Sequence, residues 1–564
     1  MTPIVLALAG GATIAAAGSA LALWRWTKGP SDPHVDRTSL ALLGVVFLLG
    51  LAEIAVLPPW EGFDEIAHWS SIQEMADLNR VPVYGVDKLS ADRLSYFGPE
   101  PRGVDHRGRT YRTEHDHPSP TAGAPTTYRP DLYPNWQAQH PPLFYALMTP
   151  VYRAAQGLGW VEHLFVLRLV CWVMAWTGLA LGASAIERAV RRDRAGAVFG
   201  RWTTPLALLW PILLAGFFAD LARLGNDSLC LLLFGGVWLL LLPMLDEGQD
   251  EIPLWRRRAE AIGLGLIMGA GLWTKAFFGP ISLGVGALLA ARAIRARSWS
   301  KGLEAGLAVG VAWAIGAGWY LMKLKTTGAL TGSDEAVQLT HAGGMMRGLA
   351  AHFSVPELLR GLAAMSETVG WASTWSLTRL SEWAMVPVVG LIVAVALGYG
   401  AKLRGASSPP RAPLILWAPL AVIAPMAAGL LYHVFLRLAI DGRGAGTPAW
   451  YLHVIAPALG MAMAIGWVRP RLFTALAAFS VVYTAASWAA ELSLFSGCTT
   501  PDALNHYDFA HRVCLIDGAA LARLGHPGLA AAAMLMALGL SIWAAIGARG
   551  AWPGQTEPQV LEPL

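Results

Sequence analysis

Apolar runs long enough to cross a lipid bilayer recur along almost the whole chain, and they constrain its fold more than any other feature. A helix needs about 20 mostly apolar residues to cross roughly 30 Å of hydrocarbon. Only 14% of the 564 residues are charged, whereas an average soluble domain has roughly 25%. We therefore predict an all-α polytopic membrane protein with about thirteen transmembrane helices, at residues 3–24, 39–58, 162–187, 203–221, 227–245, 260–275, 277–294, 303–322, 384–401, 413–433, 449–467, 472–490 and 528–547.

The distribution of Lys and Arg predicts how these helices are oriented. Basic residues collect in the short connecting loops, and each such loop falls on the same side when the spans alternate. Short basic loops stay in the cytoplasm, so we expect the N-terminus outside and the C-terminus inside. The first apolar run carries Arg25 and Lys28 after it rather than before it. This order favours a retained helix over a cleaved signal peptide.

Three long segments are then left on the outer side, at 59–161, 323–383 and 491–527. We predict that they form a small extracytoplasmic cap over one helical module, residues 1–547. The proline-containing end, 548–564, is expected to be a cytoplasmic tail. The high use of Ala, Arg and Trp is typical of a GC-rich bacterium, so the expected location is the bacterial inner (cytoplasmic) membrane.

The four cysteines divide into two kinds. Cys171 and Cys230 lie within apolar runs and are expected to be inert packing thiols. Cys498 and Cys514 flank a polar segment between two late spans. They can form a disulfide if that segment is extracytoplasmic. The alternative is two unrelated thiols.

The stretch PPWEGFDEIAH at 58–68 places an acidic pair, Asp64 and Glu65, directly after a predicted span. Carboxylates near a bilayer are costly to keep unless they have a role. A carboxylate here can accept the proton of an acceptor hydroxyl while that oxygen attacks a sugar carbon. We interpret Asp64 as the candidate catalytic base. The alternative is an acidic pair that caps a helix or braces the loop.

Two later motifs end or begin predicted outer segments. In QHPPLFY at 139–145, paired prolines fix an extended approach to a helix. His140 can therefore face a cavity and hydrogen-bond to sugar or phosphate, or it can belong to a rigid turn. In LGNDSL at 224–229, Asn226 is expected to cap the next helix.

Arg223 and Lys275 are cations at the outer ends of predicted spans. Arg223 lies just before a helix start, where a phosphate is also favoured, so it can meet a lipid phosphate. Lys275 lies between two apolar segments in WTKAFF at 273–278. It either snorkels to the interface or stabilises a phosphate leaving group, and we favour the second role.

Arg437, Arg443 and His453 surround the outer end of a late span, beside the aromatic pair WY at 450–451. Two arginines in this setting make a plausible phosphate clamp. The alternative is an interfacial belt of aromatic and basic residues.

A cluster of possible metal ligands, His106, Glu114, His115, Asp116 and His117, lies in the first outer segment. Adjacent residues in a Pro- and Gly-rich loop rarely converge on one ion, and the H-x-x-x-H spacing of a helical site is missing. A divalent metal is therefore possible but not favoured. The chain also lacks a Walker-type loop, a Rossmann fingerprint and a basic tract typical of nucleic-acid binding.

The order of these motifs resembles the GT-C superfamily of polytopic glycosyltransferases. The similarity is to the bacterial branch akin to protein O-mannosyltransferases and lipid A aminoarabinose transferases. It includes Asp64-Glu65 with the nearby His68, a candidate residue for binding the donor phosphate or the substrate. It also includes the HPPLFY and NDSL motifs, and LWTKAFF. It continues with GWY at 318–320, where a long outer segment begins, and with WYLHVIAPAL at 450–459, which is similar to the family's GRYLLPALP element.

The resemblance implies an inverting enzyme that takes a sugar from a polyprenyl-phosphate carrier on the outer face of the membrane. Asp64 would be the base, Glu65 would hold the acceptor or the loop, and Lys275 with an arginine would bind the carrier phosphate. The chain departs from the family in one added N-terminal span. It also has Trp450 where an arginine is expected, so Arg443 or Arg437 would have to substitute.

The leading hypothesis is therefore a glycosyltransferase that moves a monosaccharide from a polyprenyl-phosphate donor to an acceptor hydroxyl. No other cofactor is obligatory, and the acceptor can be a glycan, a lipid or a protein. One alternative is a polymerase or ligase acting on lipid-diphosphate glycans. Another is a lipid transporter or flippase, which would favour charges near the midplane and paired halves.

Overall fold

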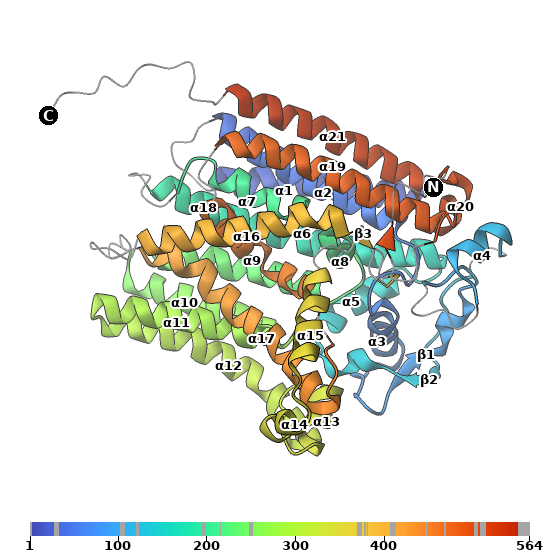
Figure 1. Ribbon diagram of the computed structural model, residues 1–564, viewed down its shortest axis with the longest axis horizontal. Coiled ribbons are helices and arrows are strands. Elements are labelled where there is room, and N and C mark those ends of the chain that lie inside the picture. The colour runs from blue at the N-terminus through green and yellow to red at the C-terminus, as the bar shows by residue number, and fades with distance from the viewer. Residues whose placement is uncertain are drawn as a thin grey trace.

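A computed structural model describes residues 3–26, 33–101, 108–119, 123–193, 199–214, 216–246, 252–368, 375–376, 379–380, 382–405, 413–445, 448–466, 470–500, 506–507 and 515–550. Within these ranges the chain is a bundle of long helices with four strands of two to five residues (Figure 1). The predicted all-α polytopic architecture is confirmed.

Eleven of the described helices are long and apolar enough to cross a membrane, or up to twelve if the bent pair α7 (Thr203–Leu213) and α8 (Gly216–Ala222) is one span. This is fewer than the thirteen predicted. The predicted span 260–275 belongs to α10 (Leu254–Leu272), which carries three arginines at 256–258 and Glu260 in its first turns. These charges leave too short an apolar stretch for α10 to count as a span by composition.

The eleven candidate spans contain α1 (Pro3–Trp26), α2 (Pro33–Val56), α6 (Trp160–Arg192), α9 (Asp227–Met244), α11 (Phe278–Ala296), α12 (Trp299–Thr327), α16 (Glu382–Gly405), α17 (Ala418–Asp441), α18 (Ala456–Gly466), α19 (Pro470–Phe495) and α21 (Pro527–Gly550). Helix α18 is short by itself and forms a span together with the 3-10 helix that precedes it. The shorter helices are α3 (Glu65–Leu78), α4 (Tyr111–Asp116), α5 (Leu143–Ala154), α13 (Asp334–His341), α14 (Met345–His352), α15 (Val355–Glu367) and α20 (Gly518–Leu524). Four 3-10 helices are η1 (Ala91–Ser95), η2 (Trp136–Gln139), η5 (Leu414–Trp417) and η6 (Ala449–Ile455), and the strands are β1 (Lys88–Ser90), β2 (Pro130–Pro134), β3 (Arg379–Leu380) and β4 (His506–Tyr507).

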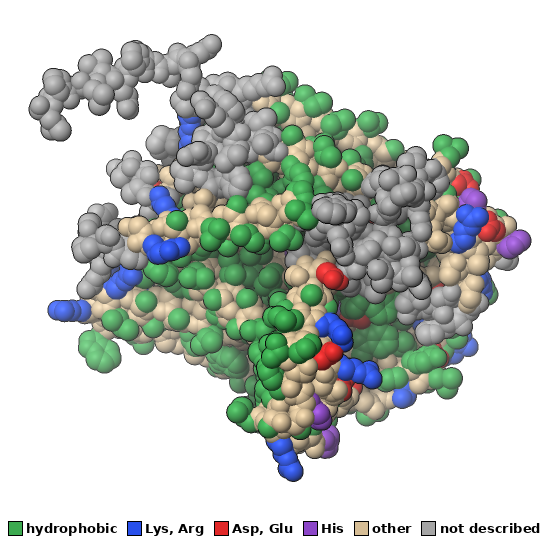
Figure 2. All heavy atoms as spheres, in the orientation of Figure 1, with side chains coloured by type: hydrophobic (Ala, Val, Ile, Leu, Met, Phe, Trp, Pro, Cys, Tyr) green, Lys and Arg blue, Asp and Glu red, His purple; other side chains and the backbone are tan. Residues whose placement is uncertain are grey.

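Several of the short elements gather at one end of the bundle. Figure 1 places α3, α4, β1 and β2 at the end where α1 begins, and the C-terminal end of α21 at the opposite end. Strand β1 pairs with β2 in antiparallel fashion, and β3 pairs with β4 in parallel. Figure 2 shows hydrophobic side chains over the long helices, with charged side chains collected toward the ends. This separation is typical of a protein whose middle lies in hydrocarbon.

Helices α6 and α9 pack with their backbones in direct contact. A Cβ atom added at Gly235 would lie 2.1 Å from the carbonyl oxygen of Gly178, and one added at Gly178 would lie 2.2 Å from that of Leu231. Small residues at such crossings allow helices to approach closely in a membrane. The crossing fixes α6 relative to α9, and both helices carry charged residues of the site described below.

We predict that Gly235→Ala destabilises the protein by about 1–3 kcal/mol, because the added methyl group forces the two backbones apart. Gly306→Ala is the matched control, since nothing lies within 4 Å of a Cβ atom there. Thermal unfolding in detergent measures both variants. Equal unfolding temperatures for the two would contradict the close α6–α9 contact.

Candidate active site

A cavity of about 980 Å³ lies where α3 and η2 meet the ends of the long helices. Its wall includes Asp64, Gln137, His140, Lys275 and Tyr451. Other side chains on the same wall are Tyr84, Trp136, Trp319, Trp375, Asp334, Glu335, His433 and Arg437. The cavity thus brings together four predicted site residues, Asp64, His140, Lys275 and Arg437.

Asp64 precedes α3 but does not cap it. Its φ is 61°, in the left-handed region, and its side chain makes no capping hydrogen bond. Instead Trp136 Nε1 donates to one carboxylate oxygen and Gln137 Nε2 to the other, each at 2.8 Å. A left-handed conformation costs a non-glycine residue about 1–3 kcal/mol. The strained backbone and the two donors aim the carboxylate at the cavity.

Burial raises the pKa of the Asp64 carboxyl. The nearby positive charge of Arg223 and the hydrogen bond from Trp136 offset part of this rise. A carboxylate with a raised pKa is a stronger proton acceptor than one in water. Asp64 therefore has the environment of a general base.

Glu65 faces away from the cavity and is completely buried. Arg168 of α6 donates to both of its carboxylate oxygens, from Nε at 2.7 Å and from Nη2 at 2.5 Å. The backbone N–H groups of Trp60 and Leu224 donate to the same carboxylate at 3.1 Å each. These contacts fit the loop-bracing alternative for Glu65, because its acceptor positions are occupied by protein groups.

The two predicted cations Arg223 and Lys275 meet at one carboxylate. Lys275 Nζ lies 2.7 Å from Asp227 Oδ1, and Arg223 Nη2 lies 2.9 Å from Asp227 Oδ2. Arg223 Nη2 also lies 2.9 Å from Asp220 Oδ1, and its Nη1 donates to the carbonyl of Phe63 at 2.7 Å. Arg223 thereby holds the backbone next to Asp64, whereas Lys275 lies on the cavity wall.

The ammonium group of Lys275 is flanked by aromatic rings. Its Nζ lies 4.5 Å from the ring centroid of Phe277 and 4.6 Å from that of Tyr451. Cation–π contacts of this kind stabilise a desolvated ammonium group. Lys275 is only 6% exposed, so its charge acts at short range on whatever occupies the cavity.

The two predicted histidines of this end take different places. His68 Nδ1 lies 3.1 Å from the hydroxyl of Tyr145, and that hydroxyl donates to the carbonyl of Gln137 at 3.2 Å. His68 thus supports the residue that holds Asp64. His140 lines the cavity, and burial lowers its pKa to about 3. It is therefore neutral at pH 7 and can offer hydrogen bonds but no positive charge.

The later predicted residues are spread more widely. His453 Nδ1 lies 3.3 Å from Asp220 Oδ2, on the carboxylate that also pairs with Arg223. Arg437 lines the cavity and pairs with Asp441 at 3.0 Å. Arg443 is exposed and does not line the cavity. Of the two arginines that could substitute at Trp450, only Arg437 therefore borders the cavity.

The predicted cap of α9 is right in position but lacks its side-chain hydrogen bond. Asn226 precedes α9 at the N-cap position, but its side chain makes no capping hydrogen bond, and its amide N and O atoms are buried without a partner. The helix start is instead packed inside the protein, where Asn226 is fully buried.

The remaining predictions concern thiols and metal ligands. Cys171 and Cys230 are buried free thiols. Cys498 is disulfide-bonded, and Cys514 lies outside the described residues, as does His106. Among the described residues, no group of three His, Cys, Asp or Glu side chains is placed to hold a metal ion.

Sequence reasoning missed three side chains that organise the site, Trp136, Gln137 and Arg168. Arg168 could have been found, because an arginine inside a predicted span almost always has a buried partner. Trp136 and Gln137 lie just before the QHPPLFY motif, separated from it by one alanine. Nothing local to them indicates a contact with Asp64, more than 70 residues earlier.

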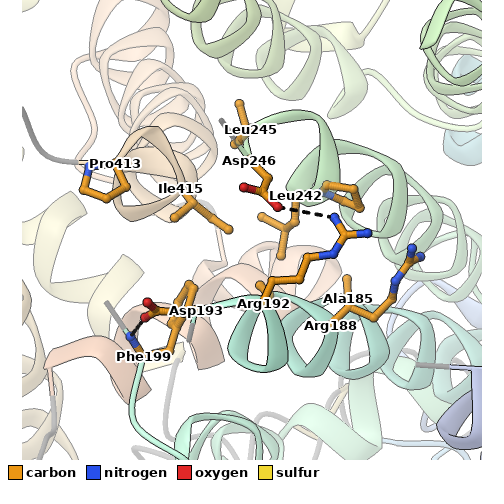
Figure 3. A pocket seen from close by; sticks show the side chains of 12 residues that line it. Ala185, Arg188, Arg192, Asp193, Phe199, Leu242, Leu245, Asp246, Pro413 and Ile415 are labelled. Carbon is orange, nitrogen blue, oxygen red and sulfur yellow. Dashed lines mark hydrogen bonds and ion pairs between the residues drawn. The ribbon is translucent and has the colours of Figure 1, made fainter. Parts of the chain in front are cut away.

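A second cavity, of about 240 Å³, lies at the opposite ends of α6 and α9 (Figure 3). Arg188, Arg192, Leu242, Asp246 and Ile415 line it. Arg192 Nη1 lies 3.6 Å from Asp246 Oδ2. Because Asp227 begins α9 and Asp246 follows its end, this cavity is separated from the Asp64 cavity by the length of that helix.

Fold and site together define a multi-pass helical membrane protein with a polar cavity at one end. No family model matches the chain, and no curated protein matches it. The chain is similar to a solved structure of ArnT from Cupriavidus metallidurans bound to undecaprenyl phosphate, with 16% identity, a TM-score of 0.39, and coverage of 91% of this chain and 77% of that chain. For ArnT in the apo state the identity is 16%, the TM-score 0.35, and the coverage 85% and 74%.

ArnT is an aminoarabinose transferase of the GT-C superfamily. With TM-scores below 0.5, the likeness carries no conclusion about the site, and the residues of this chain have to carry it.

We predict that Arg168→Met destabilises the protein by about 3–5 kcal/mol, because it leaves the Glu65 carboxylate buried without its cation. The double variant Arg168→Met/Glu65→Gln is expected to recover much of the loss, since it removes the charge as well. Unfolding in detergent measures both. Arg192→Met is the control, because its partner is partly exposed and such pairs contribute at most about 1 kcal/mol. A single variant as stable as the control would contradict the role of the pair.

Proposed function

We propose that this protein is a glycosyltransferase that moves a monosaccharide from a polyprenyl-phosphate donor to an acceptor hydroxyl. The observation that carries the proposal is the position of Asp64. Its carboxylate faces a cavity of about 980 Å³ that is also lined by Lys275 and by several aromatic side chains. A base and a cation on one cavity wall are what the transfer of a sugar from a phosphate needs.

In the proposed reaction, the acceptor oxygen attacks the anomeric carbon and its proton passes to Asp64. The bond between that carbon and the phosphate oxygen breaks, and its electron pair leaves with the phosphate. Attack from the side opposite the phosphate inverts the anomeric centre. The donors Trp136 and Gln137 keep the carboxylate in place for the proton transfer.

Lys275 is the proposed partner of the departing phosphate. Its Nζ already contacts Asp227 Oδ1 at 2.7 Å, which holds the ammonium group at the wall while leaving it further donor hydrogens. The neutral His140 on the same wall can hydrogen-bond to phosphate or sugar. Arg437, at the border of the cavity, is a second candidate cation.

The polyprenyl chain of such a donor would lie among the long apolar helices, with its phosphate at their end. We propose that the reaction takes place on the outer face of a bacterial cytoplasmic membrane, with a glycan, lipid or protein as acceptor. The charge of Lys275 compensates the leaving group, so the proposal includes no obligatory metal ion.

The first expected outcome concerns the base. Asp64→Asn is expected to lower the transfer rate by roughly 10²–10⁴-fold, because the amide cannot accept the acceptor proton. Purified wild type and variant in nanodiscs are compared for sugar release from a panel of undecaprenyl-phosphate monosaccharides. Retained folding of the variant is checked by thermal unfolding. An Asn variant as active as wild type would refute Asp64 as the base.

The second expected outcome concerns pH. Asp64 acts as a base only when ionised, so activity should fall as the pH drops through its raised pKa. Trp136→Phe removes a hydrogen bond that favours the ionised form, so the pKa rises further and the acid limb of the profile moves to higher pH. The pH dependence of kcat/KM measures this. An unmoved limb, or one moved to lower pH, would mean that Trp136 does not act on the base.

A further inference from the structure

The amide of Gln137 has one polar atom that the protein does not use. Its Nε2 donates to Asp64 at 2.8 Å, whereas its Oε1 is buried without a hydrogen-bond partner. The contact with a carboxylate fixes which end of the amide is oxygen, because the flipped amide would set two acceptors against each other. Gln137 is 5% exposed and lies on the cavity wall. The same amide group therefore holds the candidate base with its nitrogen and has an unpaired acceptor in its oxygen.

Unused donors lie on the same wall. Trp375 Nε1 and Trp319 Nε1 are both buried without a partner, and both residues line the cavity. The ring of Trp375 packs edge-on against Phe63, with ring centroids 4.5 Å apart and an interplanar angle of 79°. Its backbone N–H donates to the carbonyl of Glu61 at 3.0 Å. Trp375 is thus fixed beside Phe63, the residue that precedes Asp64.

A buried polar atom without a partner is costly, and a ligand group that pairs with it recovers that cost. The reacting hydroxyl must face Asp64, so it cannot also serve Gln137 Oε1. The group that pairs with Gln137 is then a second hydrogen-bond donor close to the reaction centre. Two hydroxyls on neighbouring carbons of a sugar ring can supply both donors, one to Asp64 and one to Gln137, whereas an alcohol with a single hydroxyl cannot.

This inference rests on the function proposed above. We propose that Gln137 Oε1 accepts a hydrogen bond from a second sugar hydroxyl, which is attached to the carbon next to the reacting carbon. Trp375 Nε1 donates to a further sugar oxygen and gives the ring an aromatic surface. The second hydroxyl belongs either to the donor, on the carbon beside its anomeric centre, or to a vicinal diol of the acceptor. In both cases Gln137 binds a sugar hydroxyl with its oxygen and donates a hydrogen bond to Asp64 with its nitrogen.

The test compares parent and deoxy compounds within each enzyme variant. The donor probes are undecaprenyl-phosphate hexoses and their 2-deoxy analogues, and the acceptor probes are methyl glycosides with and without the neighbouring hydroxyl. Wild type is expected to lose roughly 10- to 100-fold in kcat/KM with one deoxy compound. Gln137→Met should reduce that ratio to a few-fold. Because the ratio is taken within one variant, any effect of the substitution on Asp64 cancels.

Trp136→Phe is the matched control, because it removes the other donor to Asp64 but leaves Gln137 Oε1 in place. It should keep the wild-type ratio while its pH profile moves. Gln137→Ala is the second variant if the methionine does not fit. Trp375→Phe, which keeps the ring but loses the donor, should raise KM with little change in kcat.

The outcomes separate the two proposals. A loss with deoxy donors assigns the hydroxyl to the donor, and a loss with deoxy acceptors assigns it to the acceptor. Either result supports the inference. The inference is overturned if wild type has the same kcat/KM for every deoxy compound as for its parent, or if a Gln137 variant keeps the wild-type ratio of kcat/KM between parent and deoxy compound. Neither result affects the proposed glycosyltransferase reaction. Wild type that transfers no sugar at all refutes the proposed function, and this inference falls with it.

Discussion

The Glu65 carboxylate is fully buried at the end of the helical bundle, and Arg168 of α6 is the cation that compensates it. Two backbone N–H groups, of Trp60 and Leu224, complete its hydrogen bonds. One side chain therefore joins the start of α3, the N-terminal part of α6 and the loop before α9. Because the next residue in the chain is held this firmly, Asp64 can keep a left-handed backbone and face the cavity.

A second set of buried charges continues from that point. Asp220, Arg223, Asp227 and Lys275 alternate in sign, and each is at most 6% exposed. Removing such groups from water costs several kcal/mol per ion, about as much as their mutual attraction returns, so buried ion pairs often add little to the stability of a fold. The network ends at Lys275 on the cavity wall, within the same cavity as Asp64. The chemistry of the cavity therefore explains this arrangement of charges better than a contribution to the stability of the fold does.

How much of the fold and the site could be predicted from the sequence depends on how far apart in the chain the contacting residues lie. Apolar runs are local, so the helical architecture followed from them, apart from α10, whose arginines shorten its apolar stretch. The placing of Asp64, His140 and Lys275 at one end followed from the alternation of the spans. The partners did not, because Gln137 and Arg168 lie 73 and 103 residues from Asp64 and Glu65. Asn226 shows the same limit, since it takes the predicted N-cap position but its buried side chain makes no capping hydrogen bond.

The most direct test of the account is an experimental structure of the protein with an undecaprenyl-phosphate monosaccharide bound. The account predicts the phosphate within ion-pair distance of Lys275, with the anomeric carbon facing the cavity beside Asp64. A phosphate bound at Arg443, or in the opposite cavity between Arg188 and Arg192, would contradict it.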